Sequence, residues 1–203
     1  MGDVALRQSR YPEAETFYQR ALSIFRQIGN RLGEANCAQS LGNVALHRAR
    51  YAEAGEFYRH SLPIYRQICD RLGEANCVQS LGEIARMEAR YAEAETLYQQ
   101  ALPIYRQIRG RLGEANRFRS LGDLARMQDQ YAEAEQLYQQ ALPIFRQIGD
   151  HLGEASCLWS TAKLAALQHN LNLAREASEL AADIYSTIGL TAQALQVRLE
   201  FTR

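Results

Sequence analysis

The sequence predicts an all-α solenoid of antiparallel helix pairs, and two observations carry this prediction. The stretch 72–108 returns in recognisable form at 32–68 and 112–148, so that Tyr51 and Tyr91 mark positions 40 residues apart. Within each copy, apolar residues follow the three-and-four spacing of a helix with one buried face. Self-similarity at this period indicates stacked units that bury their apolar faces against their neighbours rather than around one central core.

Each copy contains two predicted helices that run in opposite directions. In the copy 71–110, one apolar stripe is centred on Leu81, and a second runs from Ala94 to Ile108. The join at residues 89–92 is too short for anything except a tight reversal, so the two helices should pack antiparallel. We call the first helix of a repeat its A helix and the second its B helix.

A glycine recurs in the middle of the A helices, although glycine in a helix interior costs about 1 kcal/mol relative to alanine. A feature this unfavourable needs a steric reason when it recurs in successive copies. We expect that the B helix crosses the A helix here, too closely for a side chain to fit. The recurring residues are Gly2, Gly42, Gly82 and Gly122.

The junctions between repeats carry residues that end one helix and begin the next. Gly29 and Gly149 suit the left-handed conformation that often follows a helix. Asn30, Asp70 and Asp150 stand directly before the next A helix, where their side chains can accept from its free N–H groups.

The central B helices each contain a proline in their second half. Proline removes one backbone hydrogen bond from a helix, so we expect a bend over the preceding turn. The residues are Pro63, Pro103 and Pro143.

We predict a single domain over residues 1–203 with atypical ends. Gly2 aligns with the middle of an A helix, so the first repeat should lack half of that helix and expose apolar surface. The last repeat diverges in sequence, as a capping unit requires. The predicted order is a partial repeat at 1–28, repeats at 31–68, 71–108 and 111–148, a divergent repeat at 151–188 and a capping helix at 191–203.

The composition is that of a folded protein without a strongly charged surface. Apolar residues make up 47% of the chain and charged residues 23%, and the formal net charge is zero, which does not favour nucleic acid or an anionic membrane as a partner. No apolar run approaches the ~20 residues that cross a bilayer. The N-terminal MGDVALRQSR lacks the apolar segment of a secretory signal. We expect a cytoplasmic location, although a fragment of a longer protein could lack the targeting signal of the whole.

The cysteines are expected to be buried thiols. Cys37, Cys77 and Cys157 occupy equivalent repeat positions, where Arg117 stands in the remaining copy. Equivalent positions on neighbouring helices lie about 10 Å apart, which exceeds the ~7 Å Cα separation that a disulfide can span. No CxxC spacing or nearby histidine accompanies these cysteines, so the sequence supports no metal site.

The pattern LGxxA…YxEAexxYxxAL resembles the tetratricopeptide repeat. The resemblance covers about residues 2–188 and implies a right-handed superhelix whose A helices line a concave groove. The 40-residue unit is similar to the longer scaffold repeats of the Leu-Gly-Asn class, whose signature is spelled by residues 41–43, and to the repeat tails of large signalling ATPases. In one copy the matching residues are Leu81, Gly82, Tyr91, Ala94, Tyr98 and Ala101.

No residues combine into a catalytic site. The histidines are scattered and have no nucleophile beside them, and no glycine-rich phosphate loop is present. One glutamate recurs per repeat, which we attribute to a helix-terminus charge or a solvated face. We therefore predict neither an enzyme nor a cofactor. The recurring residues are Glu34, Glu74, Glu114 and Glu154.

If the A helices line a groove, equivalent positions of successive repeats form rows of side chains along it. We call such a row a ladder and each of its side chains a rung; two ladders begin at Asp3 and Arg7 in the partial repeat. The residue at each rung differs between copies, whereas the buried positions of the same copies keep their residues. This difference favours a partner-binding role for the rungs, although exposed positions also change by neutral drift. The predicted partner-binding residues are Asn36, Gln39, Asn43, His47, Asn76, Gln79, Glu83, Arg86, Met87, Asn116, Arg119, Asp123, Arg126, Met127, Trp159 and Lys163.

Several rungs have structural alternatives. Glu83 with Arg86, and Asp123 with Arg126, are three residues apart and can pair within one helix. The asparagine ladder can hold an extended peptide backbone or cap the inter-repeat turn. Trp159 is either an anchor for a partner or the floor of the C-terminal cap.

The resemblance implies a protein–protein interaction scaffold that binds a peptide or partner segment in the groove. One alternative is a structural or self-association module, which would form a homo-oligomer through its open N-terminal repeat. Another is the sensor or interaction tail of a larger signalling protein.

Overall fold

The computed structural model describes the backbone of residues 2–8 and 10–200, together with their side chains apart from those of Asp3, Ala5 and Arg7. The Asp3 and Arg7 rungs and the last three residues of the predicted capping helix therefore lie outside the described residues. Contacts divide the chain into two compact units, Met1–Ile104 and Tyr105–Arg203, which we call unit 1 and unit 2.

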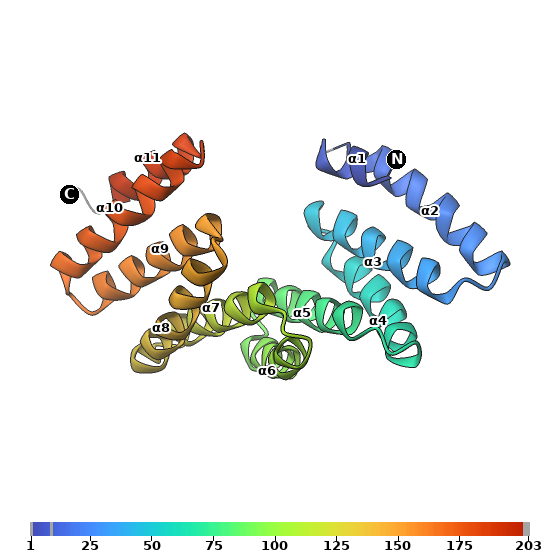
Figure 1. Ribbon diagram of the computed structural model, residues 1–203, viewed down its shortest axis with the longest axis horizontal. Helices are drawn as coiled ribbons and strands as arrows, with labels where there is room; N and C mark the ends of the chain where they lie inside the picture. The colour runs from blue at the N-terminus through green and yellow to red at the C-terminus, as the bar shows by residue number, and fades with distance from the viewer. Residues whose placement is uncertain (1, 9, 201–203) are drawn as a thin grey trace. The chain divides into compact units, whose positions relative to one another are not determined.

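Unit 1 consists of helices that pack on their neighbours in sequence (Figure 1). The A helices α3 and α5 also contact each other directly, so that their rungs stand side by side. The helices are α1 (Gly2–Arg7), α2 (Tyr11–Gln27), α3 (Arg31–His47), α4 (Tyr51–Gln67), α5 (Arg71–Met87) and α6 (Tyr91–Gln107), the last of which runs into unit 2.

Unit 2 repeats this arrangement, with direct contact between its A helices α7 and α9. The described residues contain no strand, and 86% of the chain is helical. The predicted fold class, all-α with antiparallel helix pairs in a repeat pattern, is confirmed. The helices are α7 (Arg111–Met127), α8 (Tyr131–Ile148), α9 (His151–Leu167), α10 (Leu171–Thr187) and α11 (Thr191–Glu200).

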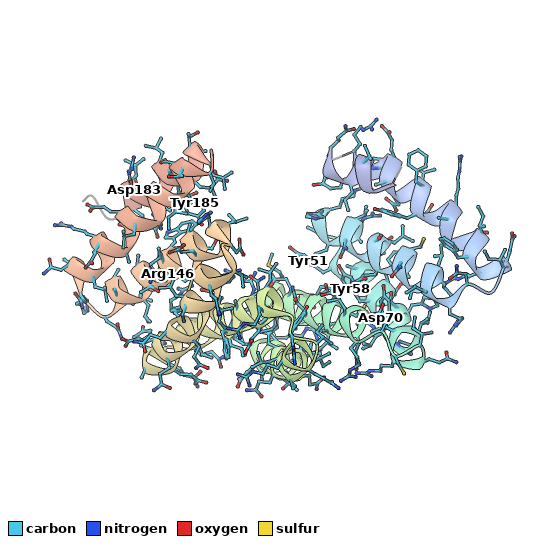
Figure 2. All side chains as sticks on the ribbon, in the orientation of Figure 1. Tyr51, Tyr58, Asp70, Arg146, Asp183 and Tyr185 are labelled. Carbon is cyan, nitrogen blue, oxygen red and sulfur yellow. The ribbon has the colours of Figure 1, made fainter. Side chains whose placement is uncertain are left out.

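The recurring A-helix glycines have the steric cause that the sequence predicts. A Cβ atom on Gly42 would lie 2.7 Å from the ring of Tyr58, which is fully buried between α3 and α4 (Figure 2). Gly82 has the same relation to Tyr98, with an added Cβ 2.7 Å from its ring. The B helix therefore crosses the A helix at each glycine, with an aromatic ring filling the space.

In the divergent last repeat, both the A-helix glycine and the B-helix tyrosine are replaced. At the position equivalent to Gly42 it has Ala162, and at the position equivalent to Tyr58 it has Ser178, and both are buried. A larger residue on the A helix is thus matched by a smaller one on the B helix. The alanine methyl group therefore takes up part of the space that the tyrosine ring fills in the other repeats.

The junctions between repeats behave as the sequence predicts. The Asp70 side chain accepts a hydrogen bond of 2.9 Å from the Gly73 backbone N–H and so caps α5 (Figure 2). Asn30 and Asp150 cap α3 and α9 in the same way. Gly149 has the left-handed conformation, with φ of 69°.

The prediction that proline bends the B helices stays a prediction. Helices α4 and α8 continue through Pro63 and Pro143 without a break in their helical assignment.

Cys69 has the left-handed conformation that glycine adopts at Gly29 and Gly149, with φ of 59°. Because this conformation costs an L-residue roughly 1–2 kcal/mol, Cys69→Gly should raise the free energy of unfolding by about 1 kcal/mol, measured by urea denaturation. Ala52→Gly, at an exposed helical position of α4, should instead lower it. Equal effects of the two substitutions would contradict the assignment of strain to Cys69.

The cysteine prediction is confirmed for Cys37, Cys77 and Cys157, which are buried, and it is wrong for Cys69, which is exposed. No disulfide joins the four residues. Burial raises the pKa of Cys77 and of Cys157 to about 12, so both thiols stay protonated at neutral pH. These residues fill space between helices, as small apolar side chains do.

Candidate functional site

The amide rungs of α3 face tyrosine hydroxyl groups of the same repeat. The hydroxyl oxygen of Tyr65 lies 2.7 Å from Asn36 Oδ1 and 2.8 Å from Gln39 Oε1. The Tyr58 hydroxyl donates to Asn43 Oδ1 at 2.7 Å. These amides therefore satisfy buried tyrosines, a role that the sequence interpretation did not include. The signal was available, because a B-helix tyrosine recurs at the same distance along the chain.

The next acidic rungs serve the same purpose. Glu83 accepts from the Tyr98 hydroxyl at 2.9 Å, and Asp123 Oδ1 accepts from the hydroxyls of Tyr138 and Ser160, both at 2.8 Å. The pKa of Tyr138 is raised, first by its burial and then by the adjacent Asp123 charge. In the repeats that carry this tyrosine, the rung is therefore a side chain that accepts a hydrogen bond from the hydroxyl group.

Lys163 occupies the same rung in the last repeat, where no tyrosine hydroxyl is present because Ser178 replaces the tyrosine. Its ammonium nitrogen lies 3.8 Å from the centroid of the Trp159 ring, which is cation–π geometry. In the repeat where serine replaces the tyrosine, the rung is therefore a cation instead of a hydrogen-bond acceptor.

The arginine rungs form the intrahelical pairs that the sequence allows. Arg86 Nε donates to Glu83 at 3.1 Å. On α7, Arg119 lies 3.4 Å and Arg126 3.9 Å from the carboxylate oxygens of Asp123. Two arginines there share one carboxylate.

The pairing on α7 leaves donors unused. The Nε atoms of Arg119 and Arg126 are buried and have no hydrogen-bond partner among the described residues. A buried donor without a partner is unfavourable. The guanidinium groups are nevertheless partly exposed, since the two side chains are 28% and 22% exposed, so their outer nitrogen atoms can contact an acceptor of another molecule.

The rungs at the ends of the A helices are mostly apolar and exposed. The side chains of Met87 and Met127 are 47% and 41% exposed. His47 instead stacks on Tyr11, with ring centroids 5.7 Å apart. Of the other predicted residues, Asn76, Gln79 and Asn116 are half-buried.

Trp159 belongs to the packing of the C-terminal helices. It packs against the buried cluster formed by α9, α10 and α11, and its Nε1 donates to Glu200 Oε2 at 3.1 Å. A cavity of about 430 Å³ opens beside it, lined by Arg126, Lys163, Ala166, Leu167 and Glu200. The tryptophan therefore forms a floor beneath α11, and the charged rungs stand at the edge of an open cavity.

Of the two interpretations of the recurring glutamates, the helix-terminus charge is confirmed, because each lies in the first turn of its A helix, and the solvated face is wrong. Glu34, Glu74 and Glu114 are buried, because arginines of two successive repeats enclose each carboxylate. Glu34 accepts from Arg26 Nε at 3.1 Å and from Arg31 Nη1 at 2.7 Å.

The pair of an arginine and a glutamate eight residues later recurs at the other junctions, although His151 replaces the second arginine at the last of them. Arg146, near the end of α8, donates from Nε to Glu154 at 2.8 Å (Figure 2). We call this arrangement the junction clamp. Its sequence signal was the arginine that recurs eight residues before each glutamate.

Two other classes of site receive no support from the described residues. They contain no group of His, Cys, Asp and Glu side chains arranged to hold a metal ion. None of their helices is both long enough and apolar enough to span a membrane.

The tetratricopeptide repeat family model matches residues 1–67, 34–107, 74–147 and 111–187. No curated protein matches the sequence significantly.

Solved structures share the fold. BtubC (BKLC) from P. vanneervenii is 18% identical, with a TM-score of 0.79 over 92% of this chain and 78% of its own. A Rap protein complexed with Competence and Sporulation Factor is 13% identical, with a TM-score of 0.73 over 98% of this chain and 60% of its own. A putative kinesin light chain from Podosopora anserina with nearly identical TPR-like repeats is 14% identical, with a TM-score of 0.70 over 93% of each chain.

Proposed function

Because the chain belongs to the tetratricopeptide repeat family, we propose that it is a protein-interaction scaffold that binds a peptide or partner segment along its A helices. The observation that carries the proposal is the pair of partly exposed guanidinium groups of Arg119 and Arg126, which share the single carboxylate of Asp123. A second carboxylate, supplied by a bound segment, would balance the remaining positive charge. The similar Rap protein, whose structure includes Competence and Sporulation Factor, supports a polypeptide or peptide ligand.

The rungs divide into two groups in this proposal. Asn36, Asn43 and Glu83 already accept from tyrosine hydroxyls, so they orient the inner surface and offer a partner only their remaining atoms. The exposed thioethers of Met87 and Met127 offer adaptable apolar contacts. The binding energy should therefore depend chiefly on the arginine and methionine rungs.

Replacement of Arg86, Arg119 and Arg126 by glutamine should weaken partner binding at least about tenfold, because charge-assisted hydrogen bonds are lost. Peptides selected from a phage-displayed library on the wild-type chain would serve as probes, titrated by calorimetry. The melting temperature should change little. A control variant with Arg20→Gln and Arg59→Gln, at exposed B-helix positions, should bind normally. Equal losses of affinity and of thermal stability would reject the assignment.

A second candidate function is self-association through the N-terminal helices. It is favoured by the exposed apolar side chains of Val4, Ile24 and Ile28 on α1 and at the end of α2. Light scattering should then show a dimer or larger species, which Ile24→Gln with Ile28→Gln converts to a monomer. A wild-type chain that is monomeric at high concentration would exclude this candidate.

A further inference from the structure

In unit 1, two arginines hold a glutamate of the preceding B helix. Arg48 Nη1 lies 2.9 Å from Glu15 Oε2, and Arg50 donates to both Glu15 oxygens at 2.9 and 3.2 Å. Arg50 also pairs with Glu53 at 3.0 Å. The pKa of Glu15 is lowered chiefly by the hydrogen bond from Arg50, which outweighs its burial. The cluster ties α2 to the turn between α3 and α4.

In unit 2, the equivalent acid remains but its cations are gone. Glu135 on α8 occupies the position of Glu15, three repeats further along the chain. Its carboxylate is exposed and accepts from Gln139 Nε2 at 3.2 Å. The residues that stand where Arg48, Arg50 and Glu53 do in unit 1 are Gln168, Asn170 and Leu173.

A cavity of about 310 Å³ lies beside Glu135, between α8, α9 and α10. Leu142, Leu164 and Leu173 are among its apolar lining residues, and Glu135 lines it as well. Thr161 also lines it and is smaller than the leucine found at this position in the three preceding repeats. The cavity therefore combines apolar walls with a carboxylate that lacks the arginines that Glu15 has.

We propose that this cavity binds an arginine side chain of a partner polypeptide. The aliphatic stem of the arginine packs against the leucines, and its guanidinium takes the place beside Glu135 that Arg50 fills beside Glu15. A lysine fits less well, because an ammonium group cannot form the paired hydrogen bonds that a carboxylate accepts from a guanidinium. The site shares no residue with the partner-facing rungs, so it stands independently of the function proposed above.

Two blocked amino acids test the proposal on the full chain. N-acetyl-arginine methylamide carries the guanidinium, and N-acetyl-citrulline methylamide is its neutral isostere. Titrations followed by methyl NMR should shift the resonances of Leu142, Leu164 and Leu173 for the arginine probe, with about tenfold weaker binding of the citrulline probe. Equal affinities of the two probes would overturn the proposal.

Three variants locate the site. Glu135→Gln should abolish the preference for arginine over citrulline, whereas Glu133→Gln, at an exposed position on the same helix, should keep it. The double variant Gln168→Arg, Asn170→Arg restores the arginines of unit 1 and should block the arginine probe, with its fold checked by circular dichroism. A preference that survives Glu135→Gln places the binding elsewhere and refutes the assignment.

A last comparison identifies the source of the arginine. A blocked Ala-Arg-Ala tripeptide should bind at least as well as free L-arginine, because a side chain on a polypeptide presents no additional charges to the cavity. Tighter binding of free L-arginine would indicate an amino-acid ligand and would overturn the proposed partner polypeptide.

Discussion

Gly42→Ala is expected to destabilise the protein by about 2 kcal/mol, although alanine favours a helix more than glycine does. The added methyl group would lie 2.7 Å from the ring of Tyr58, which is fully buried and has no space into which to move. Tyr58→Ser alone should cost about 3–4 kcal/mol through the cavity that it creates. Urea denaturation of both variants measures these costs.

The double variant decides whether the contact is the cause. The last repeat already carries alanine and serine at these positions, as Ala162 and Ser178, so Gly42→Ala with Tyr58→Ser should cost less than the sum of the single changes by at least about 1 kcal/mol. Gly55→Ala is the matched control, since its new methyl group would meet only the flexible end of Arg59. Strict additivity would show that the glycine is kept for another reason.

Glu34→Gln is expected to lower the free energy of unfolding by about 2 kcal/mol at pH 7, because hydrogen bonds to a charged acceptor are lost. Glu34 is buried beneath Arg26, Arg31 and His60, with His60 Nε2 3.0 Å from its carboxylate. Glu56→Gln, at an exposed position of α4, should change the free energy by less than about 0.5 kcal/mol.

The effect of Glu34→Gln should depend on pH. Burial raises the pKa of Glu34. Hydrogen bonds from Arg26 and His60 and the charge of Arg31 lower it by more than burial raises it, so the folded pKa lies below the ordinary 4.5. The unfolded chain thus takes up this proton at higher pH than the folded one, and the stabilisation is lost as the pH falls through the folded pKa. The difference in stability between wild type and variant should therefore shrink as the pH falls below the ordinary 4.5 and vanish below the folded pKa. A gap that persists there would mean that the charge is not responsible.

The sequence was sufficient for the fold because each helix pair repeats one pattern of apolar spacing, glycine and capping residues. The steric role of Gly42 and the cap at Asp70 depend on residues close together in the chain, and local rules predict both. The repeat also made the buried, unpaired state of Cys77 predictable, since equivalent positions on neighbouring helices are too far apart for a disulfide.

The roles of the polar side chains were harder to predict. The sequence predicted Asn36 and Gln39 as partner contacts. Only the packed helices show that both side chains contact the Tyr65 hydroxyl. The sequence predicted a helix-terminus charge or a solvated face for Glu34, and its burial was missed because the arginine that covers it comes from the preceding repeat. Periodicity identifies which face of a helix is buried, but hydrogen bonds between side chains of different helices depend on distances that a linear pattern does not contain.

The junction clamp affects how the number of repeats in such a protein can change during evolution. Arg26 with Glu34 and Arg146 with Glu154 show that neighbouring copies are joined by the same chemical parts at both ends of the array. A gene that lost or gained one 40-residue copy by unequal recombination would therefore encode a chain in which every new joint is already complementary. Such joints allow selection to act on the length of the array without first repairing its stability.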